Sequence, residues 1–303
     1  MTTEPPERFA KPRTAKLTAL LAGASVLLLA GCGTSAPELE DQSAPLKQVS
    51  ADGFEDVTAE LDFENGTAVT PITRYTVSGD FSTEVLFAQA REALITDCMT
   101  EGGLTYTGLT GVDWASLQPQ GDRVFGLWDR GAAANFGVAF DPRRGTPRET
   151  YVEAGPEFNA ALNKCGDTAM EHAVLGPLAM KLGESTLADR ILGNAVELAL
   201  NSDEGEQANA DFADCLAEKS IVVDPASGYP SSDYSELGKA AEIEAVLAEV
   251  DCNIDSGRIE TLYNLRAQYE SAYIEEYGTQ VAGVLEEKEG IQSTLRTIIE
   301  TAG

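Results

Sequence analysis

The chain has 303 residues, of which 21 are Lys or Arg and 50 are Asp or Glu, so its formal net charge at pH 7 is −29. Such an acidic balance disfavours nucleic acids and anionic lipid headgroups as partners, because both repel a negatively charged surface. Cations and basic peptides remain compatible partners. The simpler interpretation is that the charge keeps the protein soluble.

The first 32 residues have the organisation of an export signal. An apolar run covers residues 17–31, and four cations precede it: Arg8, Lys11, Arg13 and Lys16. A transmembrane helix needs about 20 apolar residues, so this shorter run predicts a signal peptide over residues 1–31. The run ends in Leu29-Ala30-Gly31-Cys32, which resembles the lipobox of bacterial lipoproteins.

The lipobox resemblance implies that Cys32 carries a diacylglyceryl group and becomes the new N-terminus after cleavage. Two acyl chains, of the palmitate type, anchor a protein stably, whereas one chain binds a membrane only marginally. We therefore expect attachment to the extracytoplasmic face of the cell membrane. The alternatives are an ordinary cleaved signal, or an uncleaved anchor in which Cys32 is incidental.

The segment after Cys32 is rich in Ser, Pro, Gly, Asp and Glu and has no sustained apolar period. This composition predicts a flexible acidic tether over residues 32–70. The remainder, residues 71–303, is predicted to be one disulfide-containing helical domain. The β character of residues 67–77 predicts that it begins with an extended strand.

Helical periodicity begins near Ser82 and continues to Glu101, where Gly102 and Gly103 predict the end of the helix. Residues 103–150 contain many glycines and both tryptophans, which predicts an irregular lobe with short strands. The predicted fold class is therefore mainly α, with a small irregular or β lobe.

Helical signals return at Pro156 and continue to the C-terminus. Further helices are expected after the Thr186–Asp189 capping-box pattern, over residues 207–219 and around residues 243–250. The last helical region, residues 258–302, is expected to break near Gly278–Gly283 or Gly290. Its apolar stripe could pack on its own domain, which is the commoner case, or on an envelope protein partner through residues 258–303.

Four cysteines follow Cys32, an even number that indicates disulfides in an exported chain. We expect the pairs Cys98–Cys165 and Cys215–Cys252, because ALITDCMTEG (93–102) and ADFADCLAEK (210–219) look like repeated helix ends. This repeat predicts two sub-units, residues 82–175 and 205–303. The cysteines lack zinc-site spacing and only one histidine is present, so we expect no metal and no cofactor.

The remaining chemical signals are few. His172 is the only histidine and is interpreted as a structural helical residue. Trp114 and Trp128, each beside an aspartate, are candidate ligand-binding residues, although burial in the core is favoured. Arg143, Arg144 and Arg148 form a basic cluster that could bind an anionic wall polymer or offset neighbouring acids. The acidic loop 201–206 lacks EF-hand spacing.

These short motifs also resemble a broad group of uncharacterised lipoproteins of actinobacterial type. The resemblance is carried by the Cys98-Met99-Thr100-Glu101-Gly102 helix end with Tyr106, and by Asp251-Cys252 before a long helix. It implies no activity. No catalytic residue is assigned, and we expect a non-enzymatic binding or assembly role. The alternative is an envelope hydrolase that uses a pair of carboxylates.

Overall fold

The computed structural model describes residues 45–109, 111–147, 155–224, 230 and 234–302. The helices of this part of the chain are α1 (Phe81–Glu101), α2 (Arg130–Phe136), α3 (Pro156–Met170), α4 (Leu175–Leu182), α5 (Leu187–Leu200), α6 (Asp203–Glu218), α7 (Lys239–Asp255) and α8 (Arg258–Thr301). Among the described residues, the only sheet is the antiparallel pair β1 (Glu60–Asp62) and β2 (Thr67–Val69). The predicted mainly helical class is confirmed.

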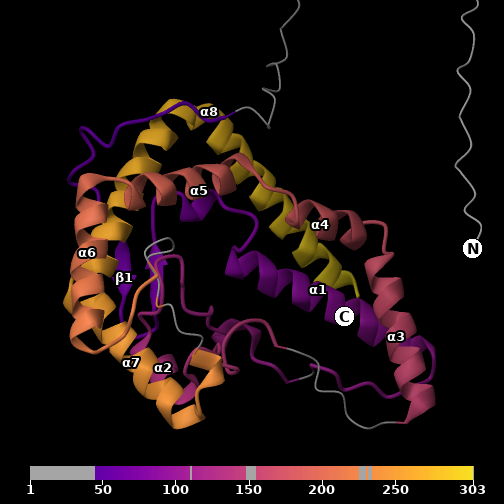
Figure 1. Cartoon of the computed structure of the whole chain (residues 1–303). Helices are drawn as coiled ribbons and strands as arrows, with labels where there is room; N and C mark the ends of the chain where they lie inside the picture. Colours follow the sequence, from indigo (N-terminus) through magenta and orange to yellow (C-terminus); the bar gives the residue numbers. More distant parts are fainter. Residues whose placement is uncertain (1–44, 110, 148–154, 225–229, 231–233, 303) are drawn as a thin grey trace, which may run out of the picture. The chain divides into compact units, whose positions relative to one another are not determined.

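The long helix α8 is the element against which most other helices pack (Figure 1). It bends at Tyr277, whose φ of −111° and ψ of 17° are not helical. The helix was predicted to break near Gly278–Gly283 or Gly290; the bend lies one residue before the first of these ranges, and Gly290 lies within the helix. We call residues 258–276 the first arm and residues 278–301 the second arm.

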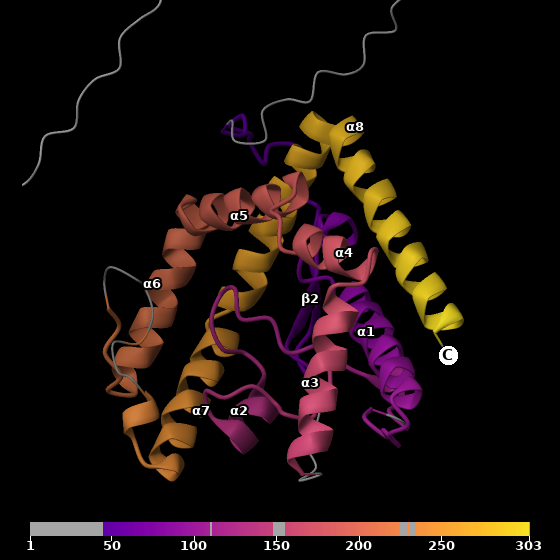
Figure 2. The same cartoon turned by 90° about the vertical axis from the view of Figure 1, so that its right-hand side faces the viewer.

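The two arms belong to different apolar clusters. Ile259 and Leu262 of the first arm pack with Phe125, Trp128 and the end of α5. In the second arm, Ile291 and Leu295 pack against α1 and α4. Figure 2 shows the same division, with α6 and α7 beside the first arm and α1 and α4 beside the second.

Helix ends follow the capping signals of the sequence. The side chain of Asp80 accepts a hydrogen bond from the backbone N–H of Thr83 at the start of α1. At its end, Gly103 adopts a φ of +72°, which a residue without a Cβ reaches at little cost. Thr186 and Asp189 form the predicted capping box of α5. Residues 201–206 were expected to form an acidic loop. This was wrong for most of the segment, because Ser202 caps α6 and the helix already starts at Asp203.

The folded part begins before the predicted boundary at residue 71. Residues 45–59 lie along α8, where the backbone N–H of Ala59 donates to Asn264. The hairpin of β1 and β2 follows them. Residues 45–70, assigned by composition to the tether, are thus ordered through contacts with α8 that local composition does not reveal. The strand expected over residues 67–77 is correct only for β2, since residues 73–75 form a 3-10 turn.

The irregular lobe has fewer strands than expected. Its described residues, 103–109 and 111–147, hold the 3-10 turn Trp114–Ser116 and α2, with no strand among them. Side chains donate hydrogen bonds to backbone carbonyl groups that would otherwise be paired with another strand in a β-sheet. Gln120 donates to the carbonyls of Asp141 and Arg144, and Arg123 donates to those of Val138 and Ala139.

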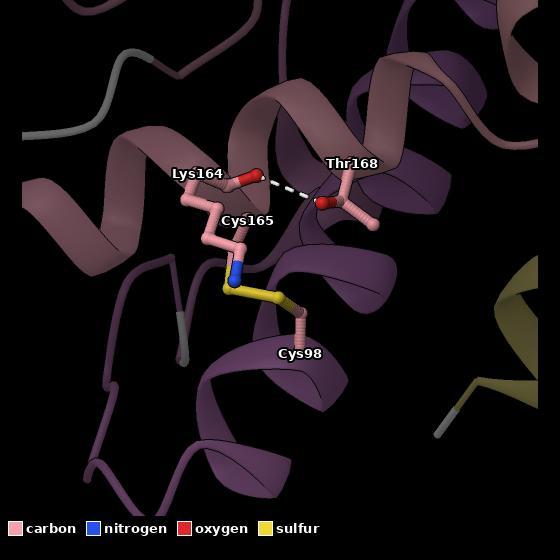
Figure 3. The surroundings of a disulfide bond; sticks show 4 residues. All are labelled: Cys98, Lys164, Cys165 and Thr168. Atoms are coloured by element: carbon pink, nitrogen blue, oxygen red, sulfur yellow. Dashed lines mark hydrogen bonds between the residues drawn. A yellow bond between two sulfur atoms is a disulfide. The ribbon is translucent and has the colours of Figure 1, made fainter.

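Both predicted disulfides are present, Cys98–Cys165 between α1 and α3 (Figure 3) and Cys215–Cys252 between α6 and α7. The first cysteine of each pair lies three residues before its helix ends, as the repeat predicts. The described residues from Pro45 onward nevertheless form one compact unit rather than two, because α8 packs against α1 as well as against α6 and α7. In the described part of the chain, no helix is both long enough and apolar enough to cross a membrane.

Candidate functional site

The lipidation candidate Cys32 lies outside the described residues, and so does Arg148 of the basic cluster. The other sequence candidates lie in three places, namely the irregular lobe, the corner between α3 and α4, and α8.

Trp128 is a core residue. Only 1% of its surface is exposed, and its ring centroid lies 5.5 Å from that of Tyr263 on α8. Its indole N–H donates to the carbonyl of Asp122 at 2.7 Å, which satisfies the one polar atom of the ring. Trp114 is half-buried on its 3-10 turn. Trp128 therefore does not form an open aromatic platform for a ligand.

The described arginines of the basic cluster are neutralised by carboxylates. Arg143 makes two hydrogen bonds to Asp141, and these lower the pKa of that carboxyl group. Arg144 donates to Asp129 at 2.8 Å and also to the carbonyl of Asn65 in the hairpin turn. The second sequence interpretation, that these cations offset neighbouring acids, accounts for both residues.

Arg144 also locks the hairpin to the irregular lobe. Gly66, in the hairpin turn, has a φ of +65°, and a Cβ at this position would lie 2.6 Å from the Cβ of Asp129. The turn therefore requires glycine for two reasons, its backbone conformation and its close approach to Asp129.

A group of buried polar side chains joins this lobe to α7 and α8. Arg258 is 1% exposed and donates to the carbonyl of Phe125 and to the side chains of Asn209 and Asn253. Asn253 in turn donates to the carbonyl of Leu127. Buried polar groups need hydrogen-bond partners in place of water. Here Arg258 and Asn253 supply donors to the buried backbone and amide oxygens.

Glu249 lies in the same region, on α7, and is 4% exposed. Burial raises the pKa of this carboxyl group, and a hydrogen bond from the Leu127 backbone opposes that rise only in part. A raised carboxyl pKa is also found in general acids. Here burial is sufficient to explain it.

A third buried set connects α8 to the chain after the hairpin. Arg266 donates to Glu270 at 2.6 Å and to the hydroxyl of Thr70 at 3.2 Å, while Glu270 accepts the backbone N–H of Ile72. These residues were missed because the stripe of residues 258–302 was followed through its apolar and aromatic side chains alone. The signal was present, since Arg258, Arg266 and Glu270 continue the spacing of the apolar stripe through Leu262 and Tyr273.

Two hollows among the described residues contain carboxylates. A cavity of about 10 Å³ lies beside Asp122, Asp129 and Arg144, room for roughly one water molecule. An open groove of about 430 Å³ is lined by Asp203, Glu204, Gln207, Asp211, Ser256 and Thr261. A sugar ring does not fit the first. In the second, Asp203 and Glu204 occupy the first turn of α6, where negative side chains stabilise a helix.

His172 has a structural position in the corner between α3 and α4 rather than inside a helix. Its Nδ1 atom accepts from the backbone N–H groups of Val174 and Leu175, both at 3.3 Å, where α4 begins. It therefore caps a helix start, a role usually taken by Ser, Thr, Asp or Asn. Among the described residues, no group of three or more His, Cys, Asp or Glu side chains is placed to hold a metal ion.

The apolar stripe of α8 packs on its own chain. Leu262, Tyr273, Val281, Ile291 and Leu295 are all buried by other elements of the described chain. A partner that binds residues 258–303 must therefore contact the outward face, which carries the exposed residues Glu275, Glu286, Gly290 and Glu300.

No family model, curated protein or solved structure matches this chain. The short motif resembling actinobacterial lipoproteins can nevertheless be explained physically. Cys98 forms a disulfide, Met99 is buried, and Tyr106 donates to Glu92 and packs on Phe158. The motif thus fixes a helix end and the loop after it, and carries no reactive group.

Proposed function

We propose that this protein is a lipid-anchored component of the cell envelope, held on the extracytoplasmic face of the cell membrane by Cys32, with a non-enzymatic binding or assembly role. The observation that carries the proposal is the Leu29-Ala30-Gly31-Cys32 motif directly after a cationic and an apolar segment. The two disulfides of the fold support it, because such bonds persist in oxidising compartments outside the cytosol.

The binding role is supported by the state of the buried polar groups. Asp129 and Asp141 are paired with arginines, Glu270 is paired with Arg266, and Glu249 faces packed backbone. A hydrolase would instead need two carboxylates about 5 to 10 Å apart across a cleft that admits substrate. The cavity beside Asp129 is too small for such a substrate. In the open groove all three carboxylates, Asp203, Glu204 and Asp211, come from α6, so no carboxylate faces them from the other side.

The anchor is tested by changing Cys32 to Ser. The unsubstituted protein is expected to partition into detergent with an acyl mass on Cys32. The variant is expected in the aqueous fraction or as an uncleaved precursor. An unmodified mature N-terminus at another residue would refute the anchor.

The binding role is tested by photo-cross-linking in the envelope from the outward face of the second arm. A cross-linking residue at Glu286 or Ser293, both outside the buried stripe, is expected to capture one defined protein. Deletion of residues 258–302 is unsuitable as a test because it would remove much of the core. Turnover of a wall glycan or peptide by the purified protein would overturn the non-enzymatic role.

A further inference from the structure

The bend of α8 coincides with the point where the N-terminal chain joins the fold. Tyr277 is the one residue of α8 with non-helical dihedral angles, and Gly278 follows it in open space. Sharp bends in helices have identifiable local causes. Here a glycine follows the bend, and the side chain of Tyr277 is held by another segment.

Residues 45–59 run antiparallel to the first arm. At the lower end Ala59 donates to Asn264, in the middle Gln268 donates to the carbonyl of Glu55, and at the upper end the backbone N–H of Lys47 donates to the hydroxyl of Tyr277 at 2.8 Å. The indigo segment reaches α8 at its bend in both views (Figures 1 and 2).

The upper end of this segment is held by three kinds of contact. Besides the hydrogen bond to Tyr277, Lys47 forms an ion pair with Glu276. Leu46 and Val49 pack against the cluster that contains Tyr273, Tyr277 and Val281. These contacts meet at the two residues that precede Gly278, where the first arm ends.

We propose that residues 45–49 form a strap that holds α8 in its bent conformation at Tyr277. The strap packs against the cluster that contains the Tyr277 ring and donates to its hydroxyl, while each arm keeps an apolar cluster of its own on α5 or on α1 and α4. Displacement of the chain before Pro45 therefore changes the contacts at the bend before those of either arm. The connection to the membrane rests on the proposed anchor at Cys32; the coupling between strap and bend does not.

Hydrogen–deuterium exchange of the purified full chain in detergent tests the coupling. Tyr277→Phe removes only the hydroxyl, and the pair Leu46→Ala and Val49→Ala removes the apolar cover. Both are expected to speed exchange of amides 274–281 by about fivefold or more, the change for one ordinary hydrogen bond, with α3 unchanged. Tyr273→Phe, one turn earlier in the same cluster, is the matched control and is expected to leave the bend unaffected. Unchanged exchange at the bend, or an equal increase throughout the chain, overturns the proposal.

A second comparison separates the strap from the anchor. The strap variants are expected to behave alike in the native and Cys32→Ser backgrounds, so a missing acyl mass would refute the anchor and leave the coupling intact. Transmission from the membrane is tested with the native chain bound to vesicles and the Cys32→Ser chain in solution. Different exchange at residues 274–281 supports transmission. Identical exchange, with the acyl mass present, overturns it.

Discussion

The two arms of α8 are stabilised in different ways. The inner face of the first arm contains Arg258, Arg266 and Glu270, which bind backbone or hydroxyl groups of loops. The second arm packs mainly apolar side chains against α1 and α4, with Lys288 as its buried charge. The difference follows from the segments that each arm contacts. Loops present backbone carbonyl and N–H groups that need hydrogen-bond partners, whereas the backbone groups of a helix are paired within that helix.

Each arm has one disulfide among its neighbouring helices, which gives the largest test of the comparison. Replacing Cys98 and Cys165 by Ala, or Cys215 and Cys252 by Ala, is expected to lower the free energy of unfolding by about 4 kcal/mol in each case. The separations of 67 and 37 residues make the two losses similar. Urea unfolding of each double variant measures them. Non-reducing peptide maps provide the control, and a fragment joining Cys98 to Cys215 would contradict the pairing.

The polar face of the first arm is tested by Arg258→Met. This change leaves the carbonyl of Phe125 and the oxygens of Asn209 and Asn253 without a donor. A loss of about 3 kcal/mol is expected in urea unfolding, because buried acceptors then keep their full desolvation cost. Arg296→Met, at an exposed position of the second arm, is the matched control and should change stability by less than about 0.5 kcal/mol. Equal losses would remove the contrast between the arms.

The buried charge of the second arm predicts a pH effect. Burial by itself raises the pKa of Asp80, but hydrogen bonds from Lys288, Ser82 and Thr83 outweigh it and leave the pKa below its ordinary value. A lowered carboxyl pKa contributes stability above the unfolded-state pKa, and this contribution is lost as pH falls through the folded-state value.

Asp80→Asn keeps an N-cap residue but removes the charge opposite Lys288. It is expected to cost about 2 kcal/mol at pH 7 and to reduce the loss of stability between about pH 4 and more acid values. Thermal unfolding as a function of pH measures both. Adding Lys288→Met should recover part of the loss, since no unpaired buried charge then remains. A double variant no more stable than Asp80→Asn would argue against this pair.

The smallest expected effect is a gain in the second arm. Gly290 is helical and a Cβ there would meet no atom within 4 Å, so Gly290→Ala should stabilise the protein by up to about 1 kcal/mol. Gly205→Ala in α6 is the contrasting variant, because its Cβ would collide with the backbone carbonyl oxygen of Ala199. It should destabilise. The thermal unfolding midpoints of both variants test this contrast. A lower midpoint for Gly290→Ala would show that the outer face of the second arm requires glycine at this position.

Sequence periodicity predicted the helices well where each had an apolar stripe and a capping signal. The start of α5 at its capping box and the end of α1 at Gly102 are examples. These helix ends are local features, so the sequence alone determines them. The disulfide pairs join distant residues and were predicted from a repeat of ten residues.

The features that were missed depend on distant residues. Residues 45–59 have the composition of a linker and are ordered by contacts with α8, including hydrogen bonds between their backbone and Asn264, Gln268 and Tyr277. The roles of Arg258 and Arg266 were hidden for the same reason, as their partners are separated from them by 133 and 196 positions. His172 was expected inside a helix, but it lies between two helices, where its ring replaces a conventional cap.

If Cys32 carries the proposed lipid anchor, the early start of the folded part limits how far from the membrane the protein can act. With acyl chains on Cys32, only the 12 residues 33–44 separate the lipid from the first described residue, and a fully extended chain of that length reaches about 45 Å. The 38 residues of a tether ending at residue 70 would have reached about 130 Å. The protein would therefore meet partners that lie close to its own bilayer, and not those deep in the cell wall.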